Sequence, residues 1–428
     1  MSEIVLSKYF NTPNSHTLDF YLSHGGYEAA KKALGTMKPA EVTDVVKRAN
    51  LRGRGGAAFS AGKKWSFIPK DSTKPKFLVV NADESEPATF KDKYILCFDP
   101  HQLLEGMIIA CHAFDAHKAY VYMRGEYVFP YKRLTAAVQE AYQKGYLGKN
   151  IMGLGFDLDV VVHRGAGAYI CGEESALLES LEGKKGFPRL RPPFPTVAGL
   201  FGCPTVINNV ETISWVGPII SKGPEWFMSL GIPTDGGNRL FSVSGHVSKP
   251  GVYELPANIA LRSLIYDHAG GIRGGKKLKA VVPGGISAAV LTADEIDISM
   301  DVDSLKAAGT MIGSAGVIVM DEDTCMVSAL QSASHFFAHE SCGQCSPCRE
   351  GTGWVEKIVN RIVHGQGRPK DLDNLLAIAG NMCGTTICAL GDAAATPVLS
   401  YIAKFRQEFE FHVKEGRCDL SQATLSSR

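Results

Sequence analysis

Three closely spaced cysteines constrain this chain more than any other stretch. Cys342, Cys345 and Cys348 form a C-x2-C-x2-C pattern within residues 340–351. Thiolates at this spacing reach a common centre only if the first two lie in a tight loop, and Gly343 permits such a turn. The segment therefore predicts a metal-binding loop.

The same segment predicts the start of a helix. Pro347 suits the first helical position, and Ser346 before it is a good N-cap. We therefore expect a helix from about Pro347, with Cys348 in its first turn. The dipole and the free N–H groups of a helix start favour an anionic thiolate cluster there.

Three cysteines need a fourth ligand. A tetrathiolate zinc site usually shows two separated C-x2-C pairs, whereas three close cysteines with a distant fourth are typical of an iron–sulfur cubane. Cys388 falls in an expected loop between helices, and Cys383 is its rival. The spacing favours an iron–sulfur cluster over a zinc knot or free core cysteines.

Composition narrows the class of protein. The 428 residues predict several domains, and a formal net charge of +1 leaves no basic field for nucleic acid. The first residues lack the pattern of a signal peptide, and no apolar run reaches the roughly 18 residues that span a membrane. Eleven irregularly spaced cysteines fit a reducing compartment and metal binding better than a disulfide framework.

A glycine-rich segment covers residues 51–65. It contains G-x-G-x-x-A at 53–58, but a dinucleotide fingerprint needs a strand before it and here we expect a helix. The glycines instead indicate backbone approaching a phosphate, with four cations nearby: Arg52, Arg54, Lys63 and Lys64. A flexible basic loop is the alternative.

Apolar strands and amphipathic helices alternate between about 75 and 220. The pattern predicts strands at 77–80, 119–122 and 158–163, and helices at 103–114, 135–143 and about 175–181. This alternation predicts a parallel, doubly wound sheet.

Polar residues follow the strands of this expected sheet. The first strand leads into the acidic segment 81–87, and 158–163 leads through a glycine-rich turn to Glu173 and Glu174. Asn208 and Asn209 offer two amides that can bond a planar heterocycle. Such groups at the carboxyl ends of strands are where α/β proteins bind ligands, although a solvated acidic turn is the alternative for 81–87.

The pattern changes twice more along the chain. From about 236 the sequence predicts a small α+β module of the β-grasp kind, with nothing that looks catalytic. From about 324 apolar residues recur at helical spacing, which indicates a helical bundle. Pro397 is expected to start the last helix, with Thr396 as its cap.

Five motifs, in this order along the chain, resemble the flavoprotein subunit of respiratory complex I, which binds NADH and FMN. They are Arg-Gly-Arg-Gly-Gly-Ala (52–57), Asn-Ala-Asp-Glu-Ser-Glu-Pro (81–87), Gly-Ala-Tyr-Ile-Cys-Gly-Glu-Glu (167–174), Glu-Ser-Cys-Gly-Gln-Cys-Ser-Pro-Cys-Arg-Glu-Gly (340–351) and Cys-Ala-Leu-Gly-Asp (388–392). The resemblance covers nearly the whole chain, and long motifs in a fixed order are specific.

The resemblance implies a fold of four parts. It divides the chain into an N-terminal helical segment with the glycine-rich loop (1–72), a Rossmann-like α/β domain for FMN and NADH (73–235), a ubiquitin-like β-grasp domain (236–323) and a helical bundle with one [4Fe–4S] cluster (324–428).

The resemblance also implies the ligands of each group. It places FMN against Gly53, Gly55, Gly56, Lys64, Asn81, Asp83, Glu84, Tyr169, Gly172, Glu173, Asn208, Asn209 and Thr212. It places NADH, the substrate, against Phe59, Phe67, Glu86, Glu174, Arg191 and Phe194. It names Cys342, Cys345, Cys348 and Cys388 as the cluster ligands.

Three positions depart from the family pattern. Ala58 and Ala88 stand where relatives usually carry glycine, and a methyl group there narrows the approach of the backbone and disfavours a positive φ. Arg191 stands where the family often has lysine, which keeps the charge and makes a phosphate contact plausible.

The implied chemistry needs no general acid, base or nucleophile. Hydride passes from nicotinamide to FMN and single electrons leave through the cluster toward quinone. The aromatic residues are candidates for stacking, and Glu86 and Glu174 for positioning NADH and for lowering the flavin potential.

The resemblance implies two partner subunits, one thioredoxin-like with a [2Fe–2S] cluster and one large iron–sulfur subunit. It implies a cytoplasmic location, peripheral on the cytoplasmic face of the inner membrane, with membrane contact only through the complex. The alternatives are a diaphorase subunit of a soluble NAD-linked hydrogenase or formate dehydrogenase, and a zinc scaffold without enzyme activity. The hydrogenase relatives often carry extra cysteine-rich domains, and we expect none here because the assigned cysteines serve one cluster.

Overall fold

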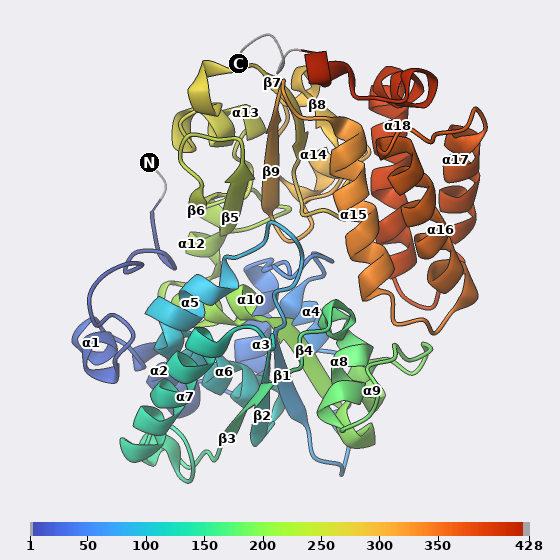
Figure 1. Ribbon diagram of the computed structural model, residues 1–428. Helices are drawn as coiled ribbons and strands as arrows, with labels where there is room; N and C mark the ends of the chain where they lie inside the picture. The colour runs from blue at the N-terminus through green and yellow to red at the C-terminus, as the bar shows by residue number, and fades with distance from the viewer. Residues whose placement is uncertain (1–2, 423–428) are drawn as a thin grey trace. The chain divides into compact units, whose positions relative to one another are not determined.

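The computed structural model describes residues 3–422, and they divide into two compact units (Figure 1). Unit 1 comprises residues up to Ser85, Thr89–Ser242 and Val252–Ile259, and unit 2 comprises Glu86–Ala88, Val243–Gly251 and the chain from Ala260. The boundaries of the four expected parts stay a prediction. Within residues 3–422, no helix combines the length and the apolar character needed to cross a membrane.

Unit 1 is built on a four-stranded sheet in which every neighbouring pair is parallel. The strand order is β3 (Asp159–Arg164), β2 (Lys118–Met123), β1 (Phe77–Ala82) and β4 (Thr205–Asn209). The chain moves from β1 to β3 in one direction and then crosses back to β4, so its connecting helices cover both faces. The predicted doubly wound parallel sheet is confirmed.

Helices cover this sheet on both sides. Figure 1 shows α2, α3 and α6 gathered on one side, with α8 and α9 on the other. α6 is buried along nearly its whole length because it packs between the sheet and the N-terminal helices. The helices of unit 1 are α1 (Leu18–Ser23), α2 (Glu28–Thr36), α3 (Pro39–Arg48), α4 (Ala61–Trp65), α5 (Asp92–Phe98), α6 (Pro100–Phe114), α7 (Val128–Gln143), α8 (Glu174–Leu181), α9 (Pro195–Ala198), α10 (Val210–Ser214), α11 (Val216–Lys222) and α12 (Pro224–Ser229).

A mixed sheet begins where the chain leaves unit 1. Its order is β6 (Gly251–Pro256), β5 (Asn238–Gly245), β9 (Gly316–Asp321), β7 (Leu278–Val282) and β8 (Leu291–Thr292), with β7 antiparallel to both of its neighbours. Short helices α13 (Leu261–Ser263) and α14 (Val302–Ala307) accompany it.

Four helices complete unit 2: α15 (Met326–Glu340), α16 (Ser346–Val363), α17 (Asp371–Met382) and α18 (Leu390–Glu415). α15 and α17 each pack against both α16 and α18, as in an up-and-down bundle. The loop after α15 and the loop after α17 therefore lie at the same end of the bundle, which Figure 1 shows.

The predicted start of the last helix is wrong. α18 begins at Leu390 and contains Pro397 in its interior, and Thr396 donates its Oγ1–H to the Asp392 carbonyl instead of capping a helix. The apolar side of α18, including Ala394, Ala395 and Val398, is buried in the bundle. Packing on both sides of the proline thus outweighs the one backbone hydrogen bond that proline removes.

A buried ion-pair network holds the glycine-rich loop in unit 1. The guanidinium of Arg54 lies 2.9 Å from the carboxylate of Asp235, which also pairs with Arg239 at 2.7 Å. All three side chains are at most 2% exposed. The Arg54 N–H donates to Thr212 Oγ1 at the start of α10, so the loop is tied at both its backbone and its side chain.

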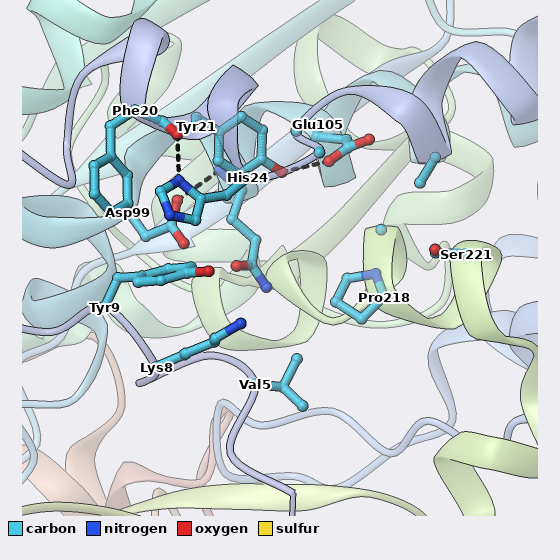
Figure 2. Close-up of a pocket in the computed structure, with 15 residues that line it drawn as sticks. Val5, Lys8, Tyr9, Phe20, Tyr21, His24, Asp99, Glu105, Pro218 and Ser221 are labelled. Carbon is cyan, nitrogen blue, oxygen red and sulfur yellow. Dashed lines mark hydrogen bonds between the residues drawn. The ribbon is translucent and has the colours of Figure 1, made fainter.

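A small cavity of about 190 Å³ lies between the N-terminal segment and α6 (Figure 2). Tyr21 donates its phenolic O–H to the buried carboxylate of Glu105 there. Asp99 accepts from the Gln102 N–H and so caps α6. Burial raises the pKa of Asp99 to about 7, against the opposing effect of the Gln102 N–H and with the help of the Glu105 charge.

We expect Asp235→Asn to destabilise unit 1 by about 3–5 kcal/mol, because it leaves two buried guanidinium groups without a counter-charge. The measurement is urea unfolding of the full chain followed by tryptophan fluorescence. Asp297→Asn is the control, since Asp297 pairs with Arg262 on an exposed surface and its loss should leave the midpoint nearly unchanged. Equal midpoints for the two variants would contradict the structural importance of the network.

Asp99→Asn tests the titration of the buried helix cap. The raised pKa means that the folded state holds a proton on Asp99 which the unfolded chain releases, so stability is lost as pH rises from about 4 to 7. Asparagine keeps the cap and does not titrate. Its stability advantage over the parent should therefore grow by about 2–3 kcal/mol between pH 5 and pH 8. Unfolding curves at both pH values check this, and an advantage that does not change with pH would refute it.

Candidate functional site

A cavity of about 790 Å³ opens in unit 1 at the carboxyl ends of β1 and β4. This volume falls in the range of pockets that hold a nucleotide-sized cofactor. Most of the residues expected around FMN and NADH line it: Gly53, Gly55, Lys64, Asn81, Gly172, Glu173, Asn208, Asn209 and Thr212, together with Phe59, Phe67, Glu174, Arg191 and Phe194. Segments that lie up to 159 residues apart in the chain thus meet in one place.

Parallel pairing brings the asparagines together. Asn81 on β1 is in register with Asn209 on β4, so both side chains leave the sheet at the same edge. Asn81 donates to the Gly172 carbonyl at 2.8 Å, and the Asn209 oxygen caps α10. Asn208 accepts from the buried Trp65 indole N–H at 2.8 Å. These bonds fix the orientation of each amide before any ligand arrives.

The glycine-rich loop forms one wall of the cavity. The Gly53 N–H donates to the Phe59 carbonyl at 2.8 Å and closes the loop on itself. A Cβ at Gly55 would lie 3.0 Å from the Cβ of Asn209, which is closer than side chains normally pack. Gly56 has a φ of +130°, a conformation that is essentially restricted to glycine. The loop therefore presents bare backbone to the cavity.

Alanine occupies two left-handed positions. Ala58 in this loop has a φ of +52°, and Ala88 in unit 2 has a φ of +75°. The disfavoured conformation expected at both positions is adopted, at a cost of about 1–2 kcal/mol per residue. The backbone thus keeps a conformation that glycine would adopt freely.

Only two of the four cations near the glycine-rich loop line the cavity, namely Lys63 and Lys64. The expectation that Arg54 faces a phosphate is wrong, because its guanidinium is buried against Asp235 and the carbonyls of Gly236 and Asn238. Arg52 donates to the Thr234 carbonyl. A count of nearby cations cannot reveal which of them are needed for internal pairing.

Charged groups also line the cavity. Lys64 Nζ lies 3.3 Å from Glu174, and Arg191 pairs with both Glu173 and Glu174. Glu173 also caps α8 by accepting from the Ser175 and Ala176 N–H groups at 2.9 Å. The negative charges of Glu173 and Glu174 are thus balanced by the positive charges of Lys64 and Arg191. A polar ligand in the cavity therefore meets groups of both signs.

Three aromatic side chains stand exposed around the cavity. Phe59 is 43% exposed, Phe67 48% and Phe194 55%. The rings of Phe59 and Phe67 face each other at a tilt, with centroids 6.1 Å apart. Exposed rings beside a cavity offer surface on which a planar base can stack.

Several expected ligands do not line this cavity: Gly56, Asp83, Glu84, Tyr169 and Glu86. The Glu84 carboxylate is buried and accepts from the N–H groups of Asp92 and Lys93 and from the Tyr127 hydroxyl. Burial and the nearby Asp92 charge raise its pKa to about 7. Glu86 belongs to unit 2, where its carboxylate accepts from the Ser287 N–H and hydroxyl.

Some lining residues were not expected: Ala57, Pro195, Thr196, Val197, Thr205 and Ile207. Thr205 and Ile207 alternate with Asn209 along β4, so the two-residue period of a strand could have found them. Residues 195–197 follow Phe194 directly and carry no distinctive signal of their own.

The cysteine loop lies at the start of α16, as predicted, but Ser346 is not the predicted N-cap because it is already the first helical residue. Cys345 is the N-cap residue, and Cys348 is buried in the first turn. Burial and the neighbouring Cys345 and Cys342 raise the pKa of Cys348, although the Ser341 hydroxyl at 3.3 Å from its sulfur opposes this. The three thiols therefore lie close enough to influence one another's charge.

Gly343 and Arg349 shape this loop. Gly343 has a φ of +76°, and Arg349 donates to the Gly343 carbonyl at 3.1 Å. Cys388 lies half-buried in the loop between α17 and α18, at the same end of the bundle, and Cys383 lies exposed at the end of α17. Both candidates for the fourth ligand thus remain at the correct end of the bundle.

Comparisons with protein families also assign the cavity region and the cysteine loop to two different domains. Residues 46–217 match the model of the Nuo51 FMN-binding domain, and residues 328–412 match the NADH-ubiquinone oxidoreductase-F iron-sulfur binding region. Residues 239–319 match the SLBB domain. The matched ranges cover the cavity of unit 1, the mixed sheet and the cysteine loop in turn.

Relatives match almost the whole chain. An F subunit of NADH-quinone oxidoreductase in Rhizobium meliloti is 52% identical over 418 residues, which is 98% of this chain and 99% of the relative. The F subunit of the same enzyme in Mycobacterium tuberculosis is 53% identical over 97% of this chain and 94% of its own length. A crystal structure of an NAD+-reducing [NiFe]-hydrogenase in the H2-reduced state has a TM-score of 0.83 at 36% identity, covering 96% of this chain and 67% of that one. The chain belongs to the family of NADH-quinone oxidoreductase F subunits.

Proposed function

We propose that this chain is the electron-entry subunit of an NADH:quinone oxidoreductase, which oxidises NADH at FMN in the cavity of unit 1. The observation that carries the proposal is the convergence of glycine backbone, strand-end amides, paired charges and exposed aromatics in one cavity. The fold, the cofactor domains and the family of the chain support it.

The residues of the cavity fit a flavin nucleotide. Gly55 lets the loop backbone pack closely against Asn209, because a Cβ there would lie 3.0 Å from the Asn209 Cβ, and the bare backbone of the loop lines the cavity. The expected FMN residues that line the cavity, among them Asn81, Asn208 and Thr212, supply amide, hydroxyl and carbonyl groups for a planar heterocycle. FMN, when bound, takes two electrons as hydride from nicotinamide and releases them one at a time.

NADH is assigned to the outer part of the cavity. Phe59, Phe67 and Phe194 offer stacking surfaces, and Arg191 offers a cation with the planar geometry that suits a phosphate. Glu174 already bonds Lys64 and Arg191 and is placed to accept from hydroxyl or amide donors of the nucleotide. The role of Glu86 in positioning NADH and tuning the flavin potential stays a prediction from the resemblance, since Glu86 belongs to unit 2 and does not line the cavity.

The [4Fe–4S] cluster is assigned to Cys342, Cys345, Cys348 and Cys388. Two loops at one end of the bundle supply these thiols, and the start of α16 favours the negative charge of thiolates there. Gly343 and Arg349 stabilise the conformation of the first loop, and neither of them is a cluster ligand. Cys383 is the rival for the fourth position.

The relatives of this chain are named as subunits, which indicates that the chain works within a larger complex. We assign two partners, a thioredoxin-like subunit with a [2Fe–2S] cluster and a large iron–sulfur subunit, which take single electrons onward to quinone. The complex then places the chain on the cytoplasmic face of the inner membrane.

A diaphorase role in a soluble hydrogenase is the second candidate. The similarity to an NAD+-reducing [NiFe]-hydrogenase favours it, but identity is 36% there against 52–53% for the quinone oxidoreductase subunits. The polypeptides that co-purify with an affinity-tagged chain distinguish the two: quinone oxidoreductase subunits support the first role, and hydrogenase subunits the second.

Phe194→Ala should raise the KM for NADH about 2- to 10-fold, because loss of a stacked aromatic removes about 0.5–1.5 kcal/mol of binding free energy. NADH:ferricyanide reduction by anaerobically purified protein measures this, and flavin absorbance checks that FMN content stays at the parent level. Phe129→Ala is the matched control, since Phe129 is 57% exposed in the same unit and does not line the cavity. The proposed function itself would be refuted if the parent protein contained no FMN or did not reduce ferricyanide with NADH.

Cys388→Ser should abolish the electron paramagnetic resonance signal of the reduced cluster and lower the iron content, because serine oxygen replaces a thiolate ligand poorly. Cys383→Ser should keep both at the parent level. FMN content should be unchanged in the two variants, since both cysteines lie in unit 2. The reverse pattern would transfer the fourth position to Cys383.

A further inference from the structure

A second group of metal-binding side chains lies in unit 2, well away from the cysteine loop. It consists of Cys325, His412 and Cys418, and their sulfur and nitrogen atoms all lie within 4.8 Å of one another. Cys325 stands just before α15, whereas Cys342 follows the end of that helix. The 15 residues of α15 separate the two groups by roughly 22 Å. The two groups therefore lie at opposite ends of the bundle.

The geometry matches a tetrahedral zinc ion. Zinc–sulfur and zinc–nitrogen bonds of about 2.3 and 2.0 Å place neighbouring sulfur and nitrogen ligands about 3.5 Å apart. The Cys325 sulfur lies 3.4 Å from His412 Nε2. Three positions up to 93 residues apart in the sequence thus bring their ligand atoms within 4.8 Å of one another.

The histidine is oriented as a metal ligand requires. His412 Nδ1–H donates to the Glu408 carbonyl at 2.8 Å, one turn earlier in α18. In the neutral ring this bond keeps the proton on Nδ1, so the Nε2 lone pair faces Cys325, as second-shell bonds arrange in zinc sites. His412 is 2% exposed, so its ring cannot easily turn away.

Groups around Cys325 favour a thiolate. Cys325 is the N-cap of α15, and the Ser328 N–H donates to its sulfur at 3.5 Å. The carboxylate of Glu408 is paired with Lys279 at 2.7 Å and accepts from the Met326 N–H next to Cys325. A doubly charged cation therefore meets an electron-rich sulfur, while the neighbouring carboxylate is balanced by its own lysine.

The third ligand comes from the chain beyond α18. The helix ends at Glu415, its C-cap Gly416 has a φ of +64°, and the following residues turn back toward the start of α15 (Figure 1). This turn places Cys418 beside Cys325. The exposed carboxylate of Asp419 lies 3.7 Å from the Cys418 sulfur but does not belong to the group of three, so the fourth position is left to water.

We propose that Cys325, His412 and Cys418 form a structural zinc site that fastens the chain after α18 to the start of α15. Zinc binding displaces the protons of the two thiols into solvent and leaves the oxidation states of sulfur and metal unchanged. The site is independent of the proposed NADH chemistry, because it lies at the far end of the bundle from the cluster loop and uses none of the cluster cysteines.

Zinc content tests the proposal in the full chain purified anaerobically with its FMN and cluster. We expect about one zinc per chain by mass spectrometry of metals after reconstitution with one equivalent of ZnCl2 and desalting. X-ray absorption at the zinc edge, which iron does not obscure, should show two sulfur neighbours at about 2.3 Å and nitrogen or oxygen at about 2.0 Å.

Two variants should lose zinc: Cys418→Ser and Cys325→Ser. Serine at 325 keeps an N-cap oxygen for α15, so the helix start is preserved. Cys203→Ser is the matched control, because Cys203 is also half-buried but lies in unit 1 outside both cavities and should retain full zinc. NADH:ferricyanide activity and iron content should stay at the parent level in all three, which shows that they fold.

Three outcomes would overturn the proposal. They are parent protein that retains no zinc after desalting, zinc that persists in both Cys418→Ser and Cys325→Ser, and a Cys325–Cys418 disulfide found by anaerobic alkylation and peptide mapping. A parent protein that lacks NADH oxidation but binds zinc through two sulfurs would refute the proposed function and leave the zinc site standing.

Discussion

The cavity of unit 1, where we propose that FMN binds, depends on the parallel pairing of β1 with β4. Register between Asn81 and Asn209 brings two polar strand ends to one edge, and the carboxyl ends of both strands open on the same space. α10 begins directly at that edge, capped by Asn209. Cofactor contacts, helix capping and sheet pairing thus share the same few residues, so none of them can change without affecting the others.

Burial of Arg54 gives the glycine-rich loop its shape. A loop of bare backbone gains little from packing, and glycine loses much conformational freedom when it is ordered. The pair with Asp235 and the bond from the Arg54 N–H to Thr212 supply the missing constraint from outside the loop. The buried side chain of Arg54 thus stabilises the loop without lining the cavity, while Lys63 and Lys64 line the cavity and supply its positive charge.

The helical bundle separates two kinds of cysteine chemistry. Its antiparallel helices place the loops after α15 and α17 at one end, where four thiols are proposed to hold an electron carrier. The other end joins the start of α15 to the chain after α18 through Cys325, His412 and Cys418. An electron-transfer site needs a partner protein at its surface, whereas the proposed zinc ion needs only to hold the chain after α18. Because the two sites lie at opposite ends of the bundle, each can meet its own requirement.

The sequence by itself determined the features that depend on neighbouring residues. The spacing of Cys342, Cys345 and Cys348, the helix start near Pro347 and the alternation of strands with helices follow from local geometry, and ordered motifs pointed to FMN and an iron–sulfur cluster. Tertiary structure alone decided where Arg54 and the Glu84 carboxylate point, whether α18 continues through Pro397, and that His412 meets Cys325. Those outcomes depend on the burial of charge and on contacts between distant segments. Neither can be predicted from the residues that neighbour a position in the sequence.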